Sequence, residues 1–403
     1  MMYLTGQHDV VPEKSKICDL THVALAFMRP NIFNQPDPHS WPMFTTVEKA
    51  RSRFCPGTAI MVAIGGWGDT HGFEVAARTE SSRELFAQNV KRMVEDTGAD
   101  GSSPTTHLTS SALISHPGVD IDWEYPGGNG ADYKLHPNPT KTWQIPAYPL
   151  LLHTLRLALG PSKILSAAVP GLPQDMLAFT PSTVPNIHPS LNFLNIMTYD
   201  LMNLRSNTTS HHTGLAASLA SINTYLALGI PPSKLNLGFA FYVKWFQTAS
   251  PSALCAPKPI GCPTALLEDP RTGADLGRAG GFSYHDPVPG GEVGASWARA
   301  RANGSYDEVG GGHYYWDAEA DLWWSWDTPE AMGRKFPAIV EEKGLGGVFA
   351  WGLGEDAERF VHLEALSREM RGWERGQGGR VEGGREGSLE GTNGILRAAV
   401  DEL

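Results

Sequence analysis

The sequence predicts an α/β fold, a (β/α)8 or TIM barrel with a small α+β insertion between its seventh and eighth strands. Eight apolar runs of strand length recur along the chain, and longer segments separate them. Continuous apolar runs are typical of strands that are buried on both faces, as in parallel sheets. The alternation of strands with helices indicates a barrel. About 100 residues between the last two runs leave room for the insertion, because a single loop and helix need far fewer.

The predicted strands are the apolar runs themselves, and three of the intervening segments are predicted helices. The strands are Met1–Gly6, His22–Met28, Ala59–Gly66, Val119–Glu124, Ile164–Pro170, Asn192–Tyr199, Leu235–Phe241 and Gly346–Trp351. The helices, which have the apolar spacing of one buried face, are Ser81–Thr97, Tyr148–Leu159 and Leu215–Leu228. In such a barrel the active site lies at the carboxyl ends of the strands, so the residues that end these runs are candidates for function.

Composition divides the chain into a discontinuous barrel, an insertion and a tail. Residues 1–246 and 329–371 supply the barrel, and residues 247–328, which are rich in Gly, Pro and aromatic residues, supply the insertion. From residue 372 to residue 403 the chain is rich in Gly and charged residues and has little to bury. We therefore expect a disordered tail there, because such a segment cannot offset the entropy of ordering.

Charge and hydropathy restrict the classes of function. The 403 residues carry a net charge of −11 with a pI near 5.7, which argues against a nucleic-acid or membrane-surface partner, since both require basic patches. No apolar run reaches the ~18 residues of a transmembrane helix. Twelve Trp and eleven Tyr suit a sugar ligand, whose apolar C–H faces stack on aromatic rings, although core packing is the alternative for each ring.

The cysteines and the two ends of the chain indicate the cellular location of the protein. Cys255 and Cys262 bracket a Pro/Gly-rich loop, so we expect a local disulfide, whereas Cys18 and Cys55 either pair or remain buried thiols. The first residues read as a strand and lack the features of a signal peptide, so we expect a truncated or mature chain of an extracellular protein. The last four residues, Val400–Leu403, resemble an ER-retention signal, which is the alternative.

One acidic stretch, Val119–Pro126, carries the strongest functional signal. Asp120, Asp122 and Glu124 stand at alternate positions, so on a strand their side chains share one face and the apolar residues share the other. Three carboxyl groups this close favour keeping one protonated near neutral pH, which is the state that a general acid requires. An exposed acidic edge strand and a divalent-metal site are the alternatives, but the aromatic residues argue against the first and a single rigid strand argues against the second.

This stretch resembles the catalytic strand of family 18 glycoside hydrolases, the chitinases and their relatives, whose pattern is D-x-x-D-x-D-x-E, usually followed by Tyr. Four other strand ends resemble the same family in chain order: Ala63–Trp67, Met197–Asp200, Gly238–Lys244 and Gly346–Trp351. Two positions depart from the family pattern, because Ala63 replaces Ser and Lys244 replaces a common Arg. The resemblance extends over roughly residues 1–365 and implies glycoside hydrolysis.

The resemblance implies a substrate-assisted reaction on N-acetylglucosamine polymers, with no cofactor and no metal. Glu124 would protonate the leaving oxygen, and Asp122 would orient the acetamido group that attacks the anomeric carbon. Tyr199 would donate a hydrogen bond to the acetamido oxygen, and Asp120 would tune Asp122 electrostatically. The resemblance assigns substrate binding to Trp351, Asp200, Met197, Trp67, Tyr242, Tyr125, Phe27 and Tyr3. For the last two, ordinary barrel packing is the alternative.

An interruption breaks the pattern at the catalytic strand. The family's first acid falls three residues before the first Asp of the stretch, where this chain has Pro117, and proline is normally excluded from a central strand. Joining Gly101 directly to Val119 would restore the motif with Asp100 as its first acid. We therefore interpret Ser102–Gly118 as an anomalous insert, either translated intron or a gene-model error, with a genuine loop as the alternative. With the insert present, a one-residue slip would turn the catalytic acid to the wrong face.

The sequence thus predicts a chitinase that cleaves β-1,4 bonds between N-acetylglucosamine units. We expect chitin or chitooligosaccharides as partners, a monomer, and an insertion that forms one wall of the substrate groove. A catalytically impaired, lectin-like chitin-binding protein and an endo-β-N-acetylglucosaminidase acting on N-glycans are the alternatives. Retention of Glu124, Asp122 and Tyr199 favours the enzyme over the lectin, and the sequence does not separate endo from exo action.

Overall fold

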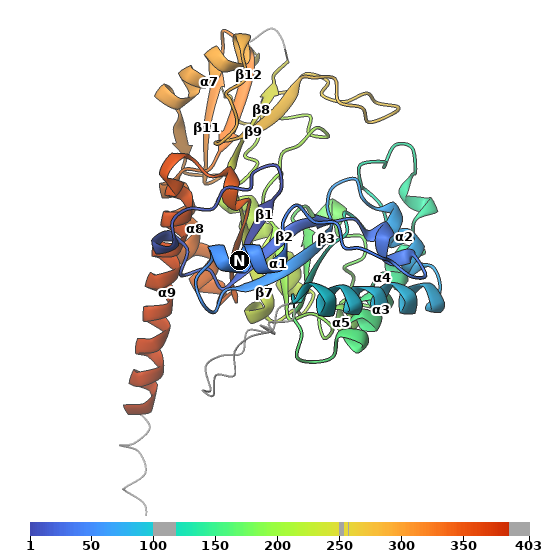
Figure 1. Ribbon diagram of the computed structural model, residues 1–403. Coiled ribbons are helices and arrows are strands. Elements are labelled where there is room, and N and C mark those ends of the chain that lie inside the picture. Colours follow the sequence, from blue (N-terminus) through green and yellow to red (C-terminus); the bar gives the residue numbers. More distant parts are fainter. Residues whose placement is uncertain (100–117, 250–253, 257, 387–403) are drawn as a thin grey trace, which may run out of the picture.

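A closed barrel of parallel strands forms the centre of the molecule (Figure 1). The computed structural model describes residues 1–99, 118–249, 254–256 and 258–386, with the backbone alone over 376–386. The barrel strands lie in the order β1-β13-β7-β6-β5-β4-β3-β2, and helices cover their outer side. This arrangement confirms the predicted (β/α)8 fold.

The barrel strands coincide with the predicted apolar runs, and no end moves by more than two residues. They are β1 (Met2–Thr5), β2 (His22–Met28), β3 (Ala59–Gly65), β4 (Val119–Asp122), β5 (Leu165–Pro170), β6 (Phe193–Met197), β7 (Leu235–Ala240) and β13 (Gly347–Trp351). Most of their side chains are buried, because alternate residues face the barrel interior and the surrounding helices.

Helices follow most of the barrel strands, and the three predicted helices correspond to α3, α4 and α6. The helices outside the insertion are α1 (Val47–Arg53), α2 (His71–Ala77), α3 (Glu80–Thr97), α4 (Gln144–Leu159), α5 (Val184–Ile187), α6 (Leu215–Ala227), α8 (Pro329–Lys335) and α9 (Val361–Glu386). The start of α3 is fixed by a capping box, since the Thr79 side chain accepts from the Ser82 N–H and the Ser82 side chain accepts from the Thr79 N–H.

The main hydrophobic core lies between the strands and the helices, and β4 contributes its outward face to it. Trp123 is 2% exposed, and its ring stacks on Phe73 of α2 with the centroids 5.4 Å apart. The same ring meets Tyr148 of α4 edge-on at 5.9 Å. Burial of a side chain of this size contributes on the order of 3 kcal/mol. With Ile121 and Trp123 fixed outward, the two Asp residues of β4 face the barrel interior.

The insertion forms a separate antiparallel sheet, shown in yellow and orange in Figure 1. Its strand order is β10-β11-β12-β8-β9. The elements are β8 (Tyr242–Gln247), β9 (Ala279–Ser283), α7 (Gly291–Asn303), β10 (Ser305–Asp307), β11 (Gly312–Asp317) and β12 (Leu322–Trp326). The sheet begins before the predicted boundary at residue 247, because the Phe241 N–H donates to Trp351 O at 2.7 Å and the chain then leaves the barrel.

Two disulfides fasten loops of the protein. Cys255–Cys262 closes the loop in the insertion, which confirms the predicted local disulfide. Cys18–Cys55 joins the segment after β1 to the segment before β3, which answers the question that the sequence leaves open for this pair.

The carboxyl end of the chain differs from the expected tail. α9 continues to Glu386, beyond residue 372, where disorder is predicted. Leu363 and Leu366 are buried, and Trp373 packs against the main core, so the helix is anchored past the predicted boundary. Residues 387–403 lie outside the described residues.

The predicted insert lies outside the described residues except for Gly118, and Asp100 lies outside them as well. From Gly118 onward the chain is in barrel register: the Val62 N–H donates to Gly118 O at 3.2 Å, and the Val119 N–H donates to Ile164 O at 3.0 Å. Within the part of the chain that is described, no helix has both the length and the apolar character that crossing a bilayer requires.

Candidate active site

Asp120 is held by three hydrogen-bond donors inside the barrel. It is fully buried, and Tyr3 Oη donates to its Oδ2 at 2.7 Å. Ser166 Oγ and Asn195 Nδ2 donate to its Oδ1 at 2.6 Å and 3.1 Å. Asn236 Nδ2 donates in turn to Asn195 Oδ1 at 2.9 Å, so polar side chains from five strands cross the barrel. Burial raises the pKa of Asp120, and the three donors oppose that rise.

Asp122 differs from Asp120 in lacking donors. The residue is 4% exposed, and its Oδ1 has no hydrogen-bond partner among the described residues. Burial raises its pKa well above the usual range, and the charges of Glu124 and Asp120 raise it further. A side chain in this state can hold a proton, or it can accept a donor that a ligand brings.

Glu124 lies two residues beyond the end of β4, whereas the sequence places it at the strand end. Burial raises its pKa to about 7; a hydrogen bond with Tyr125 opposes this rise, while the charges of Asp200 and Asp175 add to it. A carboxyl group that titrates near neutral pH can both give and take a proton, which suits a general acid and base. Because Asp122 and Glu124 are coupled neighbours, a proton on one favours charge on the other.

Two glycines bring β3 close to this strand end. A Cβ on Gly65, which has φ +114°, would lie 2.1 Å from the Asp122 carbonyl oxygen. Gly66, with φ +97°, donates its N–H to the same oxygen at 2.9 Å, and a Cβ there would lie 2.7 Å from the Phe27 ring. Only glycine fits both positions. The close approach is followed at once by Trp67, which is 59% exposed.

Aromatic residues gather around the acids inside the barrel. The Phe27 ring stacks on Trp351 with centroids 5.4 Å apart, and Tyr3 lies 5.5 Å from the same indole. Met197 and Tyr199 belong to the same cluster, which confines all five side chains to the barrel interior. Burial raises the pKa of Tyr199 well above its usual range, so its hydroxyl remains a neutral hydrogen-bond donor.

The remaining aromatic candidates lie at the edge of this cluster. Trp67 meets Tyr125 edge-on with centroids 6.3 Å apart, and Tyr199 meets Tyr242 edge-on at 6.2 Å. Tyr242 starts β8 instead of ending the seventh barrel strand, which corrects the predicted element. The insertion therefore contributes to the site through the first residue of its sheet.

Asp200 is the acid whose charge is matched by a cation, Lys244, with His212 beside it. Lys244 Nζ lies 3.2 Å from its Oδ1, and His212 Nδ1 lies 3.7 Å from the same atom. Burial would raise the pKa of Asp200, but Lys244 and His212 together hold it below its usual range. Asp200 therefore stays ionised, and 44% of its side chain remains exposed to a ligand. Lys244, at the position where the family commonly has Arg, is occupied by this ion pair.

Sequence reasoning missed the polar groups that support the acids. Ser166 and Asn195 interrupt apolar strands, so a signal for them was available in the strand pattern. Glu355 is 7% exposed, and burial raises its pKa to about 7, yet no motif marks it. Among the described residues, no group of three or more His, Cys, Asp or Glu side chains is arranged to hold a metal ion.

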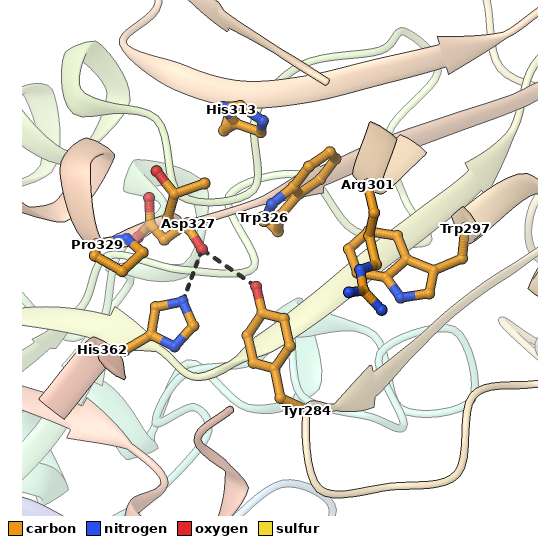
Figure 2. A pocket seen from close by; sticks show the side chains of 9 residues that line it. Tyr284, Trp297, Arg301, His313, Trp326, Asp327, Pro329 and His362 are labelled. Atoms are coloured by element: carbon orange, nitrogen blue, oxygen red, sulfur yellow. Dashed lines mark hydrogen bonds between the residues drawn. The ribbon is translucent and has the colours of Figure 1, made fainter. Parts of the chain in front are cut away.

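A separate pocket of about 250 Å³ lies where the insertion meets α8 and α9 (Figure 2). Trp297 forms part of its wall, while Tyr284 Oη and His362 Nε2 both donate to Asp327 O at 3.2 Å. The rings of Tyr284 and His362 stack with centroids 4.8 Å apart. None of the predicted site residues lines this pocket, and its polar groups are used in joining the insertion to the barrel.

Comparisons with known proteins agree on one family. The sequence model for "Glycosyl hydrolases family 18" matches residues 1–356. Endochitinase 1 of Metarhizium robertsii is 26% identical over 309 residues, which cover 74% of this chain and 62% of the relative. A chitinase from Rhizomucor miehei superposes with a TM-score of 0.68 at 21% identity, covering 92% of this chain and 99% of that one. A chitinase-like agglutinin from Robinia pseudoacacia gives 0.62 at 20% identity, covering 92% and 98%.

The extent of these matches decides what they establish. The Metarhizium enzyme is longer, so the match spans less than two thirds of it. The solved structures share less than 25% identity and therefore show the fold. The family match, in contrast, extends from residue 1 to residue 356, which include the barrel strands and the insertion and make up most of the 403 residues, so the chain belongs to family 18 of the glycosyl hydrolases.

Proposed function

We propose that this protein is a chitinase that hydrolyses β-1,4 bonds between N-acetylglucosamine units by substrate-assisted, retaining catalysis. One observation carries the proposal: Asp122, which is buried, and Glu124, which is partly buried, lie at the carboxyl end of β4, and each has a raised pKa. Acids in that state suit proton transfer to a leaving oxygen, because the glycosidic oxygen leaves poorly without a proton.

The roles of the acids follow from their different surroundings. Glu124 donates its proton to the leaving oxygen and afterwards takes a proton from the incoming water. Asp122, whose Oδ1 is without a partner among the described residues, accepts the acetamido N–H and turns the acetamido oxygen toward the anomeric carbon. Tyr199 donates a hydrogen bond from its hydroxyl to that oxygen. Asp120, which its hydrogen bonds hold in place, tunes the pKa of Asp122 through its charge.

Aromatic rings supply the affinity for an uncharged sugar. Trp351, stacked on Phe27, forms the floor beneath the reacting unit. Trp67 is exposed just beyond β3, so it offers a ring face to the sugar on the leaving-group side. Stacking of sugar C–H faces on such rings needs no positive charge, which fits the acidic composition of the chain.

A chitin-binding lectin is the second candidate function, because one of the similar structures is a chitinase-like agglutinin. In a lectin the rings would bind the sugar, and the proton state of Glu124 would be irrelevant. The raised pKa of Glu124 supports the enzyme instead, since acids with strongly perturbed pKa values are concentrated at catalytic sites.

Product release from a chitin oligosaccharide tests both candidates. The full chain is compared with a variant that lacks Ser102–Gly118, and Glu124→Gln is made in each. Activity of the full chain that disappears with Glu124→Gln supports the chitinase and identifies the insert as a tolerated loop. Activity of the shortened chain alone supports the chitinase and the interpretation of the insert as foreign. Binding without cleavage by both folded proteins supports the lectin.

The same family and the two disulfides support an extracellular location, which we also propose. Disulfides form and persist in oxidising compartments. Detection of the protein in the culture medium of its source, with both disulfides intact by mass spectrometry, is the expected result. A wholly intracellular, reduced protein would contradict it.

A further inference from the structure

Arg205, in the loop after β6, holds the loop that follows the catalytic acid. Its Nη1 donates to Asn129 O at 2.9 Å, and its Nη2 donates to Gly130 O at 3.0 Å. The guanidinium also lies 3.9 Å above the centre of the Tyr133 ring. Only 18% of the Arg205 side chain is exposed. A planar group with two directed bonds and a stacked ring fixes the loop in one position, which a flexible ammonium cannot do.

Asp175 joins a second loop to the same arginine. It ends the short 3-10 helix Pro173–Asp175 after β5, is 5% exposed, and lies with its Oδ1 3.7 Å from Arg205 Nη1. That Oδ1 makes no hydrogen bond to any described residue. Asn129 Nδ2 donates to Gln174 O at 2.7 Å, which ties the β5 loop to the β4 loop. Asp175 is thus fixed in the interior beside the loop that follows Glu124, and its charge adds to the rise in the pKa of Glu124.

We propose that Arg205 and Asp175 are positioning residues for the general acid. Arg205 holds the loop that carries Glu124, and the carboxylate of Asp175 keeps Glu124 in its protonated form. The proposal rests on the proposed hydrolysis and deepens it. The reason is that a fixed negative charge nearby disfavours a second negative charge, so a proton on Glu124 is retained until the leaving oxygen takes it.

Asp200 and Asp175 are the two carboxylates whose charges raise the pKa of Glu124. The titratable groups whose charges act on or respond to Glu124 are Asp122, Tyr125, Tyr199, Asp200 and Asp175. Those around Asp175 are Arg205, Glu124, Tyr125 and Tyr225. Asp200 is paired with Lys244, whose Nζ lies 3.2 Å from its Oδ1. Asp175 is the one of the two that lies beside Arg205, whose directed hydrogen bonds go to the β4 loop.

The proton affinities agree with this geometry. Burial raises the pKa of Asp175 to about 6, although Arg205 opposes the rise, and the pKa of Glu124 is raised to about 7. Between these two values Asp175 is mostly ionised while Glu124 is mostly protonated. Arg205 therefore serves twice, because it also keeps Asp175 charged.

The first test is the pH dependence of kcat/KM for a chitin oligosaccharide in Asp175→Asn. The side chain keeps its shape but loses its charge, so the alkaline limb should move to lower pH by about one pH unit, with activity near pH 5 preserved. Asp37→Asn, which neutralises a surface carboxyl with 65% side-chain exposure, is the matched control and should leave the limb in place. A uniform loss at every pH without a moved limb would overturn the role of Asp175.

The second test separates the two residues. Arg205→Lys keeps the positive charge beside Asp175 but cannot reproduce the two bonds to the β4 loop. We expect kcat/KM to fall about tenfold at every pH, with the alkaline limb unmoved. Full activity of Arg205→Lys would overturn the loop-holding role, because it would show that the positive charge alone is sufficient.

A third test measures thermal stability as a function of pH, which does not require the protein to be an active enzyme. Carboxyl groups whose pKa is higher in the folded than in the unfolded state make stability fall as pH rises between the two values, here from 4.5 to about 7 for Glu124. Because Asp175 has a raised pKa of its own, the coupling is read from Glu124→Gln made with and without Asp175→Asn: the part of the Tm drop between about pH 5 and about pH 7.5 that Glu124→Gln removes should be smaller when the Asp175 charge is absent. An inactive parent that shows this difference would refute the hydrolase and retain the coupling. Equal effects of Glu124→Gln in the two backgrounds would refute the coupling itself.

Discussion

The hydrogen bond from Tyr3 to Asp120 can be compared with a matched bond elsewhere in the barrel. Tyr3 Oη lies 2.7 Å from Asp120 Oδ2, and Tyr225 Oη lies 2.7 Å from Pro170 O. Both tyrosines are buried, with exposures of 1% and 0%. The two bonds therefore have the same length and similar burial but differ in the acceptor, which is a carboxylate in one case and a neutral carbonyl in the other.

Replacing each tyrosine with phenylalanine should show that the bond to the carboxylate contributes more to folding stability than the bond to the carbonyl. A bond to a charged acceptor contributes about 1.5–3 kcal/mol and a neutral one about 0.5–1.5 kcal/mol. In Tyr3→Phe the free energy of unfolding should fall by about 2–3 kcal/mol. Ser166 and Asn195 both bond to Asp120 Oδ1, so the substitution leaves Asp120 Oδ2 without a donor. In Tyr225→Phe we expect about 1 kcal/mol.

The two variants should also differ in their response to pH. Loss of a donor to the ionised form raises the pKa of Asp120 further above its unfolded value. Such a shift makes folding stability fall as pH rises through the range between the unfolded and folded values. The extra destabilisation of Tyr3→Phe should therefore be larger at about pH 7 than at about pH 4, whereas that of Tyr225→Phe should be the same at both.

Urea unfolding followed by Trp fluorescence at both pH values measures these differences. The slopes should remain equal to that of the parent, so that the shift in midpoint reports stability. Equal losses in the two variants, or a Tyr3→Phe loss that does not depend on pH, would show that Asp120 is not ionised in the folded protein and would refute the assignment of Tyr3 as its donor.

Three further outcomes follow from the geometry. The kcat/KM for a chitin oligosaccharide should fall about tenfold per pH unit above about pH 7, since Glu124 must be protonated; a limb near pH 4.5 would contradict its burial. Lys335→Met should destabilise the fold by about 3–5 kcal/mol, because it leaves the fully buried Asp327 without its cation. The double substitution Lys335→Met with Asp327→Leu should be nearly neutral in thermal unfolding. Trp67→Ala should raise KM for oligosaccharides at least about fivefold without changing Tm, since the ring is exposed; an unchanged KM would remove it from the site.

The barrel and the acids of β4 could be predicted because both depend on local pattern. Strand periodicity alone puts Asp120 and Asp122 on the face opposite Ile121 and Trp123, and burial of Trp123 against α2 and α4 fixes that choice. Positions at strand ends were also predictable, since parallel strands of a barrel present their carboxyl ends on one side. The exact end of β4 was not, because Glu124 leaves the strand where pairing with β3 and β5 stops.

The supporting groups could not be predicted because their partners are remote in sequence. Asn195 and Asp120 are 75 positions apart, and Arg205 and Asn129 are 76 apart. Nothing in a local pattern distinguishes a polar residue that serves another strand from one that serves its own loop. The pairing of Cys18 with Cys55 was open for the same reason, since it depends on how the segments after β1 and before β3 meet.

The four acids of the site show how one barrel end can hold carboxyl groups in different states. Asp120 has three donors, which favour its charge against burial. Asp200 is paired with Lys244 and stays ionised. Among the described residues, Asp122 Oδ1 has no partner and Glu124 has its hydrogen bond with Tyr125, so the pKa values of both acids are raised and we expect the available proton to reside on this pair. Chemistry therefore concentrates where partners are missing, and a substitution that supplied a cation beside Asp122 should abolish catalysis while stabilising the fold.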